Sequence, residues 1–182
     1  MRYFFDTEFI DDGRTIELIS IGIVAEDGRE FYAANLDCNL SKASQWVKDN
    51  VISLLPPRTV GSRYWMRKNV IRAEVAFFLG CEQINPLKGF EYVLAENTEK
   101  PEIWAYYADY DWVVFCQLFG TMMDLPKGFP MYCRDIKQEC DRLGNPDLPN
   151  QEHGLHDALE DARHNFVAWK FLDEYRLKTG LP

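Results

Sequence analysis

The chain has 182 residues, with 20 Lys and Arg against 29 Asp and Glu, so its formal net charge is −9 at pH 7. Because 47% of the residues are hydrophobic and 14% are aromatic, the chain can bury a large core, which excludes wholesale disorder. The length predicts a single domain over residues 1–182. The acidic balance disfavours binding along long nucleic acids through many phosphates, but it allows action at a chain end where metal ions supply positive charge.

The sequence also predicts a cytoplasmic protein that does not enter the membrane. No apolar run approaches the roughly 20 residues that span a bilayer, and the N-terminus turns acidic too early for a signal peptide. The five cysteines are scattered and form no closely spaced pair. This spacing argues against a disulfide framework or a zinc ribbon and favours a reducing compartment.

The start of the chain predicts three strands joined by tight turns. Residues 2–9 are rich in aromatic side chains, residues 15–25 are rich in Ile and Val, and a third β-rich run covers residues 31–33. Asp-Gly pairs separate these runs, and Asp-Gly is a strong hairpin signal. We therefore expect an antiparallel meander of three strands within a mixed sheet.

After the meander, the hydrophobic period changes to that of helices. Ser41 is a candidate N-cap for a short helix over residues 41–49, and the apolar spacing predicts a longer helix over residues 62–79. The remaining predicted elements are a buried strand at 102–108, a helix at 109–119, a short strand at 131–135, a helix at 135–143 and a final amphipathic helix at 157–177. This mixture of strands and helices fits an α/β fold with helices on the faces of a mixed sheet.

Two carboxylates lie two residues apart in the first predicted strand. Because side chains alternate across a strand, Asp6 and Glu8 project from the same face, about 7 Å apart. Burying two carboxylates among aromatic residues is unfavourable unless cations compensate them, and Mg²⁺ and Mn²⁺ prefer oxygen ligands. The pair is therefore a candidate divalent-metal site, with an exposed acidic edge strand as the alternative.

Further acidic residues occur where the strand at 102–108 meets the next helix. Asp109 and Asp111 are two residues apart, so on a helix they point about 200° away from each other. At most one of them faces a shared site. The other is explained by the preference for carboxylates in a first helical turn, where they cap the helix or interact with its dipole.

A third group of polar residues surrounds the start of the last predicted helix. Asp157 followed by Glu160 resembles a capping box, which places the helix start at Asp157. His156 then lies on the preceding loop, and Asp161 lies just over one turn inside the helix. A surface histidine and a solvated helix face would explain each residue alone. Only the combination with the other two groups indicates chemistry.

Together the three groups resemble the DEDDh family of 3′–5′ exonucleases, the relatives of ribonuclease T, oligoribonuclease and the proofreading exonucleases. Members carry Asp-x-Glu on the first strand, a middle Asp where a strand meets a helix, and a His separated by four residues from a final Asp. The chain matches this order, and its HDALEDA segment is close to the family's His-x-Ala-x-x-Asp-Ala. It most resembles the small actinobacterial and phage-type exoribonucleases of the superfamily. The matching residues are Asp6, Glu8, Asp111, His156 and Asp161.

The resemblance implies a ribonuclease H-like fold with a mixed five-stranded sheet flanked by helices. It implies removal of nucleoside 5′-monophosphates from the 3′ ends of single-stranded RNA by a two-metal mechanism. Asp6, Glu8, Asp111 and Asp161 would hold two Mg²⁺ or Mn²⁺ ions. His156 would act as the general base, a role that suits histidine near neutral pH. The resemblance to dimeric relatives also suggests a homodimer.

Two alternatives and two secondary sites accompany this hypothesis. The alternatives are a 3′–5′ exonuclease acting on DNA and a non-catalytic nucleotide-binding module on the same fold. Phe9 and Ile10 follow the carboxylate pair, so they are candidates to pack against the terminal base, with packing in the core as an equal alternative. A basic cluster over residues 58–72, which includes Trp65, would guide a strand by phosphate contact and stacking, or would form a solvated helix face.

Overall fold

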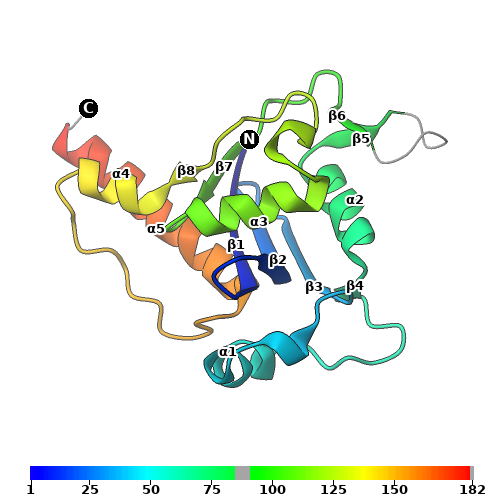
Figure 1. Cartoon of the computed structure of the whole chain (residues 1–182). Helices are drawn as coiled ribbons and strands as arrows, with labels where there is room; N and C mark the ends of the chain where they lie inside the picture. The colour runs from blue at the N-terminus through cyan, green and yellow to red at the C-terminus, as the bar shows by residue number, and fades with distance from the viewer. Residues whose placement is uncertain (85–90, 181–182) are drawn as a thin grey trace.

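The computed structural model describes residues 1–84 and 91–180, and a six-stranded mixed sheet forms its centre. The strands lie in the order β4-β3-β2-β1-β7-β8, and a separate two-stranded sheet pairs β5 with β6 (Figure 1). No helix within the described ranges combines the length and the apolar character needed to cross a bilayer. The strands are β1 (Arg2–Asp11), β2 (Ile16–Ala25), β3 (Glu30–Asn35), β4 (Trp65–Met66), β5 (Cys81–Gln83), β6 (Tyr92–Leu94), β7 (Glu102–Ala105) and β8 (Arg134–Asp135). The α-helices are α1 (Gln45–Asn50), α2 (Lys68–Phe78), α3 (Asp109–Phe119), α4 (Ile136–Arg142) and α5 (Ala158–Thr179).

The predicted antiparallel meander is confirmed. β1 pairs with β2 and β2 pairs with β3, in both cases antiparallel. Gly13 and Gly28 adopt positive φ values of 78° and 89° in the two connecting turns, a conformation that glycine reaches without strain. The pairing with β2 places Asp6 opposite Gly22. This register fixes which side chains of β1 face each side of the sheet.

The mixed α/β architecture is confirmed, but the sheet has six strands rather than the five expected. The additional strand is β4, which pairs parallel with the end of β3, whereas β8, which pairs parallel with β7, lies within the short strand expected over residues 131–135. Strands this short carry no readable period, so their pairing depends on the edges that neighbouring strands offer. The helix expected over residues 62–79 accordingly begins only at Lys68, because Trp65 and Met66 have joined the sheet.

Capping side chains set the starts of two helices. Ser44, and not Ser41, caps α1, because the Ser44 hydroxyl accepts a hydrogen bond of 3.2 Å from a backbone amide of the first turn. Asp157 caps α5 as predicted, and its carboxylate accepts from two amides of that helix. The Asp157 cap fixes the point at which the loop that carries His156 becomes helical.

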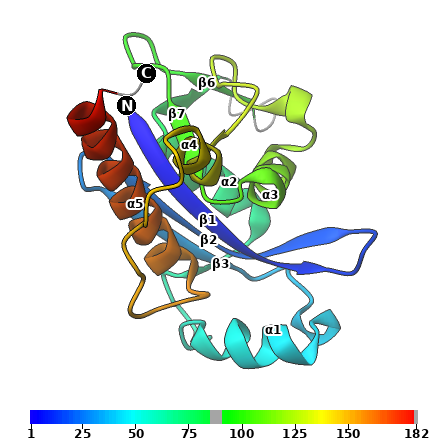
Figure 2. The ribbon, with the colours of Figure 1, turned by 90° about the vertical axis from the view of Figure 1, so that its left-hand side faces the viewer.

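Helices cover both faces of the sheet (Figure 2). α2 and α3 pack on one face, over a core cluster that includes Phe5 and Phe115. α4 and α5 pack on the other face, over a cluster that includes Phe4 and Trp104. Because side chains alternate along β1, Asp6 extends from the same face as Phe4, toward α5.

The start of α5 lies close to the sheet beside Asp6. The side-chain amide of Asn165 donates to the carbonyl oxygen of Phe5 at 3.0 Å. A Cβ atom at Gly22 would overlap the backbone of Ala158, so glycine is required for β2 and α5 to approach this closely. Because Gly22 lies opposite Asp6, the approach brings the first turns of α5 next to the acidic part of β1.

The parallel pairing of β1 with β7 ends before the acidic residues of β1. Their register runs from Arg2 opposite Glu102 to Phe4 opposite Trp104. β7 ends at Ala105, after which the chain turns into α3, whereas β1 continues past this point. Ligands of α/β folds commonly bind at the carboxyl ends of parallel strands.

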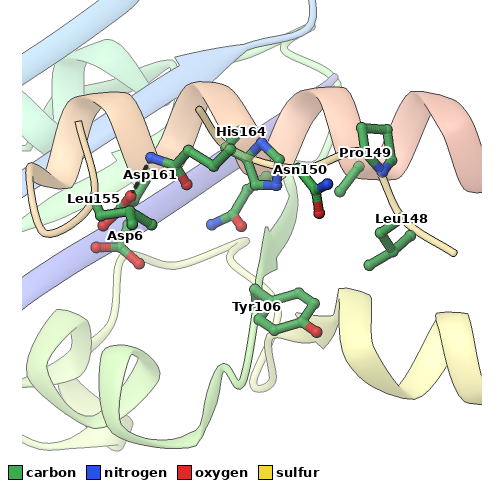
Figure 3. A pocket seen from close by; sticks show the side chains of 11 residues that line it. Asp6, Tyr106, Leu148, Pro149, Asn150, Leu155, Asp161 and His164 are labelled. Carbon is green, nitrogen blue, oxygen red and sulfur yellow. Dashed lines mark hydrogen bonds between the residues drawn. The ribbon is translucent and has the colours of Figure 1, made fainter. Parts of the chain in front are cut away.

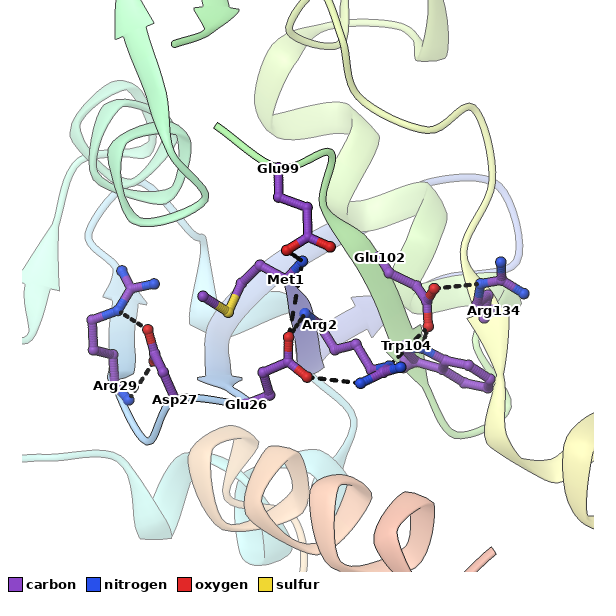
Figure 4. A network of polar contacts seen from close by, with 9 residues as sticks. All are labelled: Met1, Arg2, Glu26, Asp27, Arg29, Glu99, Glu102, Trp104 and Arg134. Atoms are coloured by element: carbon purple, nitrogen blue, oxygen red, sulfur yellow. Dashed lines mark hydrogen bonds and ion pairs between the residues drawn. The ribbon is translucent and has the colours of Figure 1, made fainter. Parts of the chain in front are cut away.

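Charged residues hold the opposite end of β1 (Figure 4). The amino group of Met1 lies 2.6 Å from the carboxylate of Glu99. Arg2 pairs with Glu26 at 2.9 Å and with Glu102 of β7 at 3.4 Å. Exposed ion pairs contribute about 0–1 kcal/mol each, so these contacts matter more for aligning β1 with its neighbours than for total stability.

Candidate active site

Asp6 and Glu8 extend from β1 on the side covered by α5. Both are partly buried, while Thr7 between them is buried on the opposite face. The alternation of a regular strand therefore produces the expected pair of carboxylates on one face. The pair lies just beyond the point where β1 and β7 separate.

Asp111 approaches the same strand from the first turn of α3. One oxygen of its carboxylate accepts hydrogen bonds from the backbone amide of Thr7 at 2.8 Å and from the Thr7 hydroxyl at 2.6 Å. The start of α3 is held by Asp135, whose carboxylate accepts from the amide of Ala108 at 2.7 Å. Asp111 is buried, whereas Asp109 is exposed. The structure thus brings Asp111, and not Asp109, to the acidic strand.

Asp161 and His156 come from the first turns of α5 and from the loop before it. One oxygen of Asp161 accepts from the backbone amide of His156 at 3.0 Å, and the other accepts from the side chain of Gln151 at 2.6 Å. His156 has a positive φ of 67°. Its ring meets that of Trp46 in α1 edge to face, with centroids 4.9 Å apart. Contacts with α5 and with α1 therefore position this histidine.

Three of these residues come close enough to surround one ion. Ligand atoms of Glu8, His156 and Asp161 all lie within 4.8 Å of one another. Carboxylate oxygens are donors that Mg²⁺ and Mn²⁺ favour, so the acidic residues fit such an ion. Imidazole suits other transition metals better. His156 therefore fits a role beside a Mg²⁺ ion rather than as its ligand.

Electrostatic repulsion links the four carboxylates. Burial raises the pKa of Asp6, and the charges of Asp111, Glu8 and Asp161 raise it further. Burial and the neighbouring carboxylates raise the pKa of Glu8 to about 8. Burial also raises the pKa of Asp111 to about 6, against the hydrogen bonds from Thr7, and it raises the pKa of Asp161. A bound cation would relieve this repulsion, so the donor set fits a divalent metal.

The sequence is similar to those of known proteins over almost its whole length. A family model described as the 3′–5′ exoribonuclease Rv2179c-like domain matches residues 1–172. The chain belongs to the Rv2179c-like family. The 3′–5′ exoribonuclease Rv2179c of Mycobacterium tuberculosis strain H37Rv is 41% identical over 172 residues, which cover 94% of this chain and 93% of that protein. The 3′–5′ exoribonuclease MT2234.1 of strain CDC 1551 gives the same identity and coverage.

A solved structure with much lower sequence identity to this Rv2179c-like chain shares its fold. The structure of S. pombe Pop2p, in its form with Mg²⁺ and Mn²⁺ bound, aligns with a TM-score of 0.53. The alignment covers 96% of this chain and 82% of the Pop2p chain, at 11% identity. The alignment confirms the expected ribonuclease H-like α/β architecture. At this identity it shows the fold alone.

A cavity of about 400 Å³ opens beside the carboxylates (Figure 3). Asp6 and Asp161 lie at one end of it, and Tyr106, His164 and Asn150 line it farther along α5. Its volume falls within the range of about 300–1,000 Å³ that is common for small-molecule sites. The cavity gives a ligand a route from solvent to two of the four acidic side chains.

The two residues after Glu8 have different surroundings. The ring of Phe9 stacks on Tyr110, with centroids 5.9 Å apart and planes 12° apart, and Tyr110 is 56% exposed. Phe9 therefore contributes to an aromatic surface beside Asp111. The structure does not bring Ile10 to the site, because Ile10 is buried in a core cluster formed with α1 and its neighbours. Opposite the step from Glu8 to Phe9, β2 carries one extra residue, Ile19.

The basic cluster over residues 58–72 does not form a stacking surface in this Rv2179c-like chain. Trp65 is buried, and its indole N–H donates to the carbonyl oxygen of Pro56 at 2.8 Å. The guanidinium of Arg58 lies over the Trp65 ring, and that of Arg63 lies over Tyr64. Trp65 therefore packs in the fold and cannot stack on a base.

Three supporting residues were not identified by the motifs. Thr7 holds the middle carboxylate, Gln151 holds the last one, and Trp46 contacts the histidine. Thr7 has a signal in the sequence, since a polar residue between two site carboxylates on a strand must face the opposite, helix-covered side. Gln151 and Trp46 have none, because tertiary packing alone brings their loop and short helix to the site.

Proposed function

We propose that the chain is a metal-dependent 3′–5′ exoribonuclease that forms a single domain over residues 1–182. The observation that supports this most strongly is the meeting of four carboxylates and one histidine beside β1, just beyond its pairing with β7. The family and the relatives named above are 3′–5′ exoribonucleases. The proposed substrate is the 3′ end of single-stranded RNA, and the proposed product is a nucleoside 5′-monophosphate.

Asp6, Glu8, Asp111 and Asp161 would hold two Mg²⁺ or Mn²⁺ ions. Their raised pKa values reflect burial and mutual repulsion that cations would relieve. Pop2p, which shares the fold, has been solved with both of these metals bound. When bound, such a pair supplies an acidified water and charge stabilisation at the phosphate. Thr7 would keep Asp111 oriented for this role through its two hydrogen bonds.

His156 would act as the general base. Histidine accepts protons near neutral pH, and positioned proton transfer contributes about 10²–10⁴-fold to a rate. The hydrogen bond from its backbone to Asp161 anchors the loop, and its ring nitrogen lies close to Glu8 and Asp161. The imidazole would take a proton from the attacking water while the bond between phosphorus and the 3′-oxygen of the preceding nucleotide breaks.

Phe9 would support a base next to the scissile bond. Its stack with Tyr110 provides an aromatic surface beside Asp111. Stacking of a base on an aromatic side chain is worth about 1–3 kcal/mol and accepts any base. This tolerance suits an enzyme that must remove each nucleotide in turn.

We also propose a cytoplasmic location and a homodimer, on separate grounds. All five cysteines are free thiols, which suits a reducing compartment. The homodimer rests on the resemblance to dimeric relatives. Sedimentation at several protein concentrations would test it.

Hydrolysis of 5′-labelled single-stranded RNA and DNA of one sequence tests the proposed function. We expect a descending ladder from RNA in Mg²⁺ or Mn²⁺ and no products in EDTA. Faster degradation of DNA would support the DNA-directed alternative. Binding of nucleotides without hydrolysis in either metal would support the non-catalytic alternative.

A further inference from the structure

A second cavity brings together basic side chains in this otherwise acidic chain. It has a volume of about 480 Å³, and Arg67, Lys68 and Arg72 from the start of α2 line it. Asp37 also lines it, lies 3.3 Å from the Arg67 guanidinium, and accepts a hydrogen bond from the backbone amide of Lys68. The Asp37 carboxylate thus already occupies the N-terminus of the helix and pairs with Arg67. We call this cavity the basic pocket.

The pairing of the strands places the basic pocket at a defined distance from the site. Phe9 in β1 lies opposite Leu18 in β2. The side chain of Asn35 in β3 donates to the Leu18 carbonyl, and Asn35 lies opposite Met66 in β4, directly before Arg67. These residues form one row across the sheet. With neighbouring strands about 4.8 Å apart, three steps separate Phe9 from Met66 by about 14 Å.

The basic pocket and the aromatic surface lie on the same face of the sheet. Phe9 and Met66 both pack against the core cluster that α2 and α3 cover. α3 connects the two places directly, since it carries Asp111 near one end and Leu118, which lines the basic pocket, near the other. Seven residues of helix correspond to about 10 Å. A strand leaving the carboxylates over Phe9 therefore reaches the pocket by a short path along α3.

We propose that the basic pocket binds a backbone phosphate of the RNA substrate upstream of its 3′ end. This inference rests on the proposed function. The proposed cations would offset the carboxylates only at the scissile phosphate, so phosphates farther upstream need other positive charge, and Arg and Lys are the usual phosphate contacts. A stacked strand advances about 3.4 Å per nucleotide, so the pocket lies about four nucleotides from Phe9, or fewer when the strand is extended.

If the basic pocket binds an upstream phosphate, its effect on hydrolysis depends on the length of the RNA. A dinucleotide fills the carboxylate site but cannot reach the basic pocket, whereas an RNA of about eight nucleotides reaches both. We expect Lys68→Gln, and more strongly Arg67→Gln with Lys68→Gln, to lower the ratio of kcat/KM for the octamer to kcat/KM for the dinucleotide by about 3–10-fold. The dependence of octamer kcat/KM on KCl should become shallower, by about 0.7 in logarithmic slope for one lost phosphate contact.

Lys178→Gln is the matched control. Lys178 is an exposed cation at the far end of α5, where it pairs with Glu174 at 3.4 Å, so its loss removes the same charge away from the pocket. An unchanged octamer-to-dinucleotide ratio in the Lys68 variants, or an equal fall in Lys178→Gln, would overturn the basic pocket while leaving the proposed function intact. A wild-type protein that hydrolyses neither RNA would instead overturn the proposed function, and the pocket with it. Melting temperatures confirm that each variant is folded.

Discussion

The hydroxyl and the backbone amide of Thr7 donate to the same oxygen of Asp111, at 2.6 and 2.8 Å. This double contact joins the first turn of α3 to β1 at the place where β1 has separated from β7. The charge of Asp111 also raises the pKa values of Asp6 and Glu8. Asp109, two residues earlier, is exposed and has no part in this contact.

Asp111→Asn should abolish nearly all hydrolysis, while Asp109→Asn should retain most of it. Asp111 is 7% exposed and held against the acidic strand, so replacing its charge removes a proposed metal ligand without a large change in shape. Asp109→Asn makes the same chemical change in the same first turn of α3, but at a side chain that is exposed to solvent. Steady-state rates of both variants in Mg²⁺ measure the difference. The reverse pattern would require the site to be rebuilt around Asp109.

Thr7→Val should lower metal affinity and rate about 10–100-fold, the usual effect of removing a group that orients a metal ligand. The change keeps the shape and the backbone amide and removes only the hydroxyl donor to Asp111. Thr15→Val is the control, since the Thr15 hydroxyl also donates to a carboxylate, that of Asp12, but on an exposed turn. Mn²⁺ titration and hydrolysis should change together in Thr7→Val and stay at wild-type values in Thr15→Val.

The metal-free protein should lose stability as the pH rises from about 5 to about 9. In the folded state the pKa of Asp111 is about 6 and that of Glu8 about 8, above the value of about 4 for carboxyls in an unfolded chain. The folded state therefore binds more protons across this window, so stability is greatest below the unfolded values and falls as each carboxyl ionises. Thermal unfolding in EDTA at several pH values measures the slope.

Glu8→Gln provides the control for this pH dependence. The variant removes the carboxyl with the pKa of about 8, so its melting temperature should depend less on pH between about 6 and 9. Added Mg²⁺ should raise the melting temperature of the wild type most at the alkaline end. A wild-type melting temperature that rises with pH across the window in EDTA would show that the carboxylates do not repel one another as described.

His156→Ala should reduce the rate about 10²–10⁴-fold and spare metal binding, because the proposed role is proton transfer. The backbone amide that donates to Asp161 remains in the variant, so the loop keeps its anchor. His153→Ala is the control, since His153 is an exposed histidine of the same loop. Loss of Mn²⁺ affinity in His156→Ala would assign the imidazole to the metal instead.

Much of the site could be predicted because its residues lie in regular structure. Alternation along a strand placed Asp6 and Glu8 on one face, and the Asp157 cap located Asp161 just inside α5. Helix periodicity and the family resemblance together selected Asp111. In each case a short-range rule predicted the direction of the side chain. The order of the motifs, which resembles that of the family, predicted which distant residues would meet.

The features that could not be predicted depend on contacts between distant segments. β4 exists because β3 offers it an edge, and its two residues have no period of their own. Ile10 is buried in the cluster that α1 and its neighbours form, and the sequence of β1 gives no sign of where that short helix packs. Trp46 reaches His156 from a helix of six residues whose place is set by packing.

Mn²⁺ binding measured in parallel with hydrolysis tests the carboxylate site most directly. Titration of the metal-free wild type, followed by calorimetry or by the Mn²⁺ resonance signal, should give two ions per chain, and hydrolysis should appear as they bind. Asp161→Asn should lose at least one ion and nearly all activity, while Asp109→Asn should keep both. Hydrolysis that persists in EDTA, or an Asp161→Asn variant that binds two ions and degrades RNA at the wild-type rate, would contradict the proposed metal site.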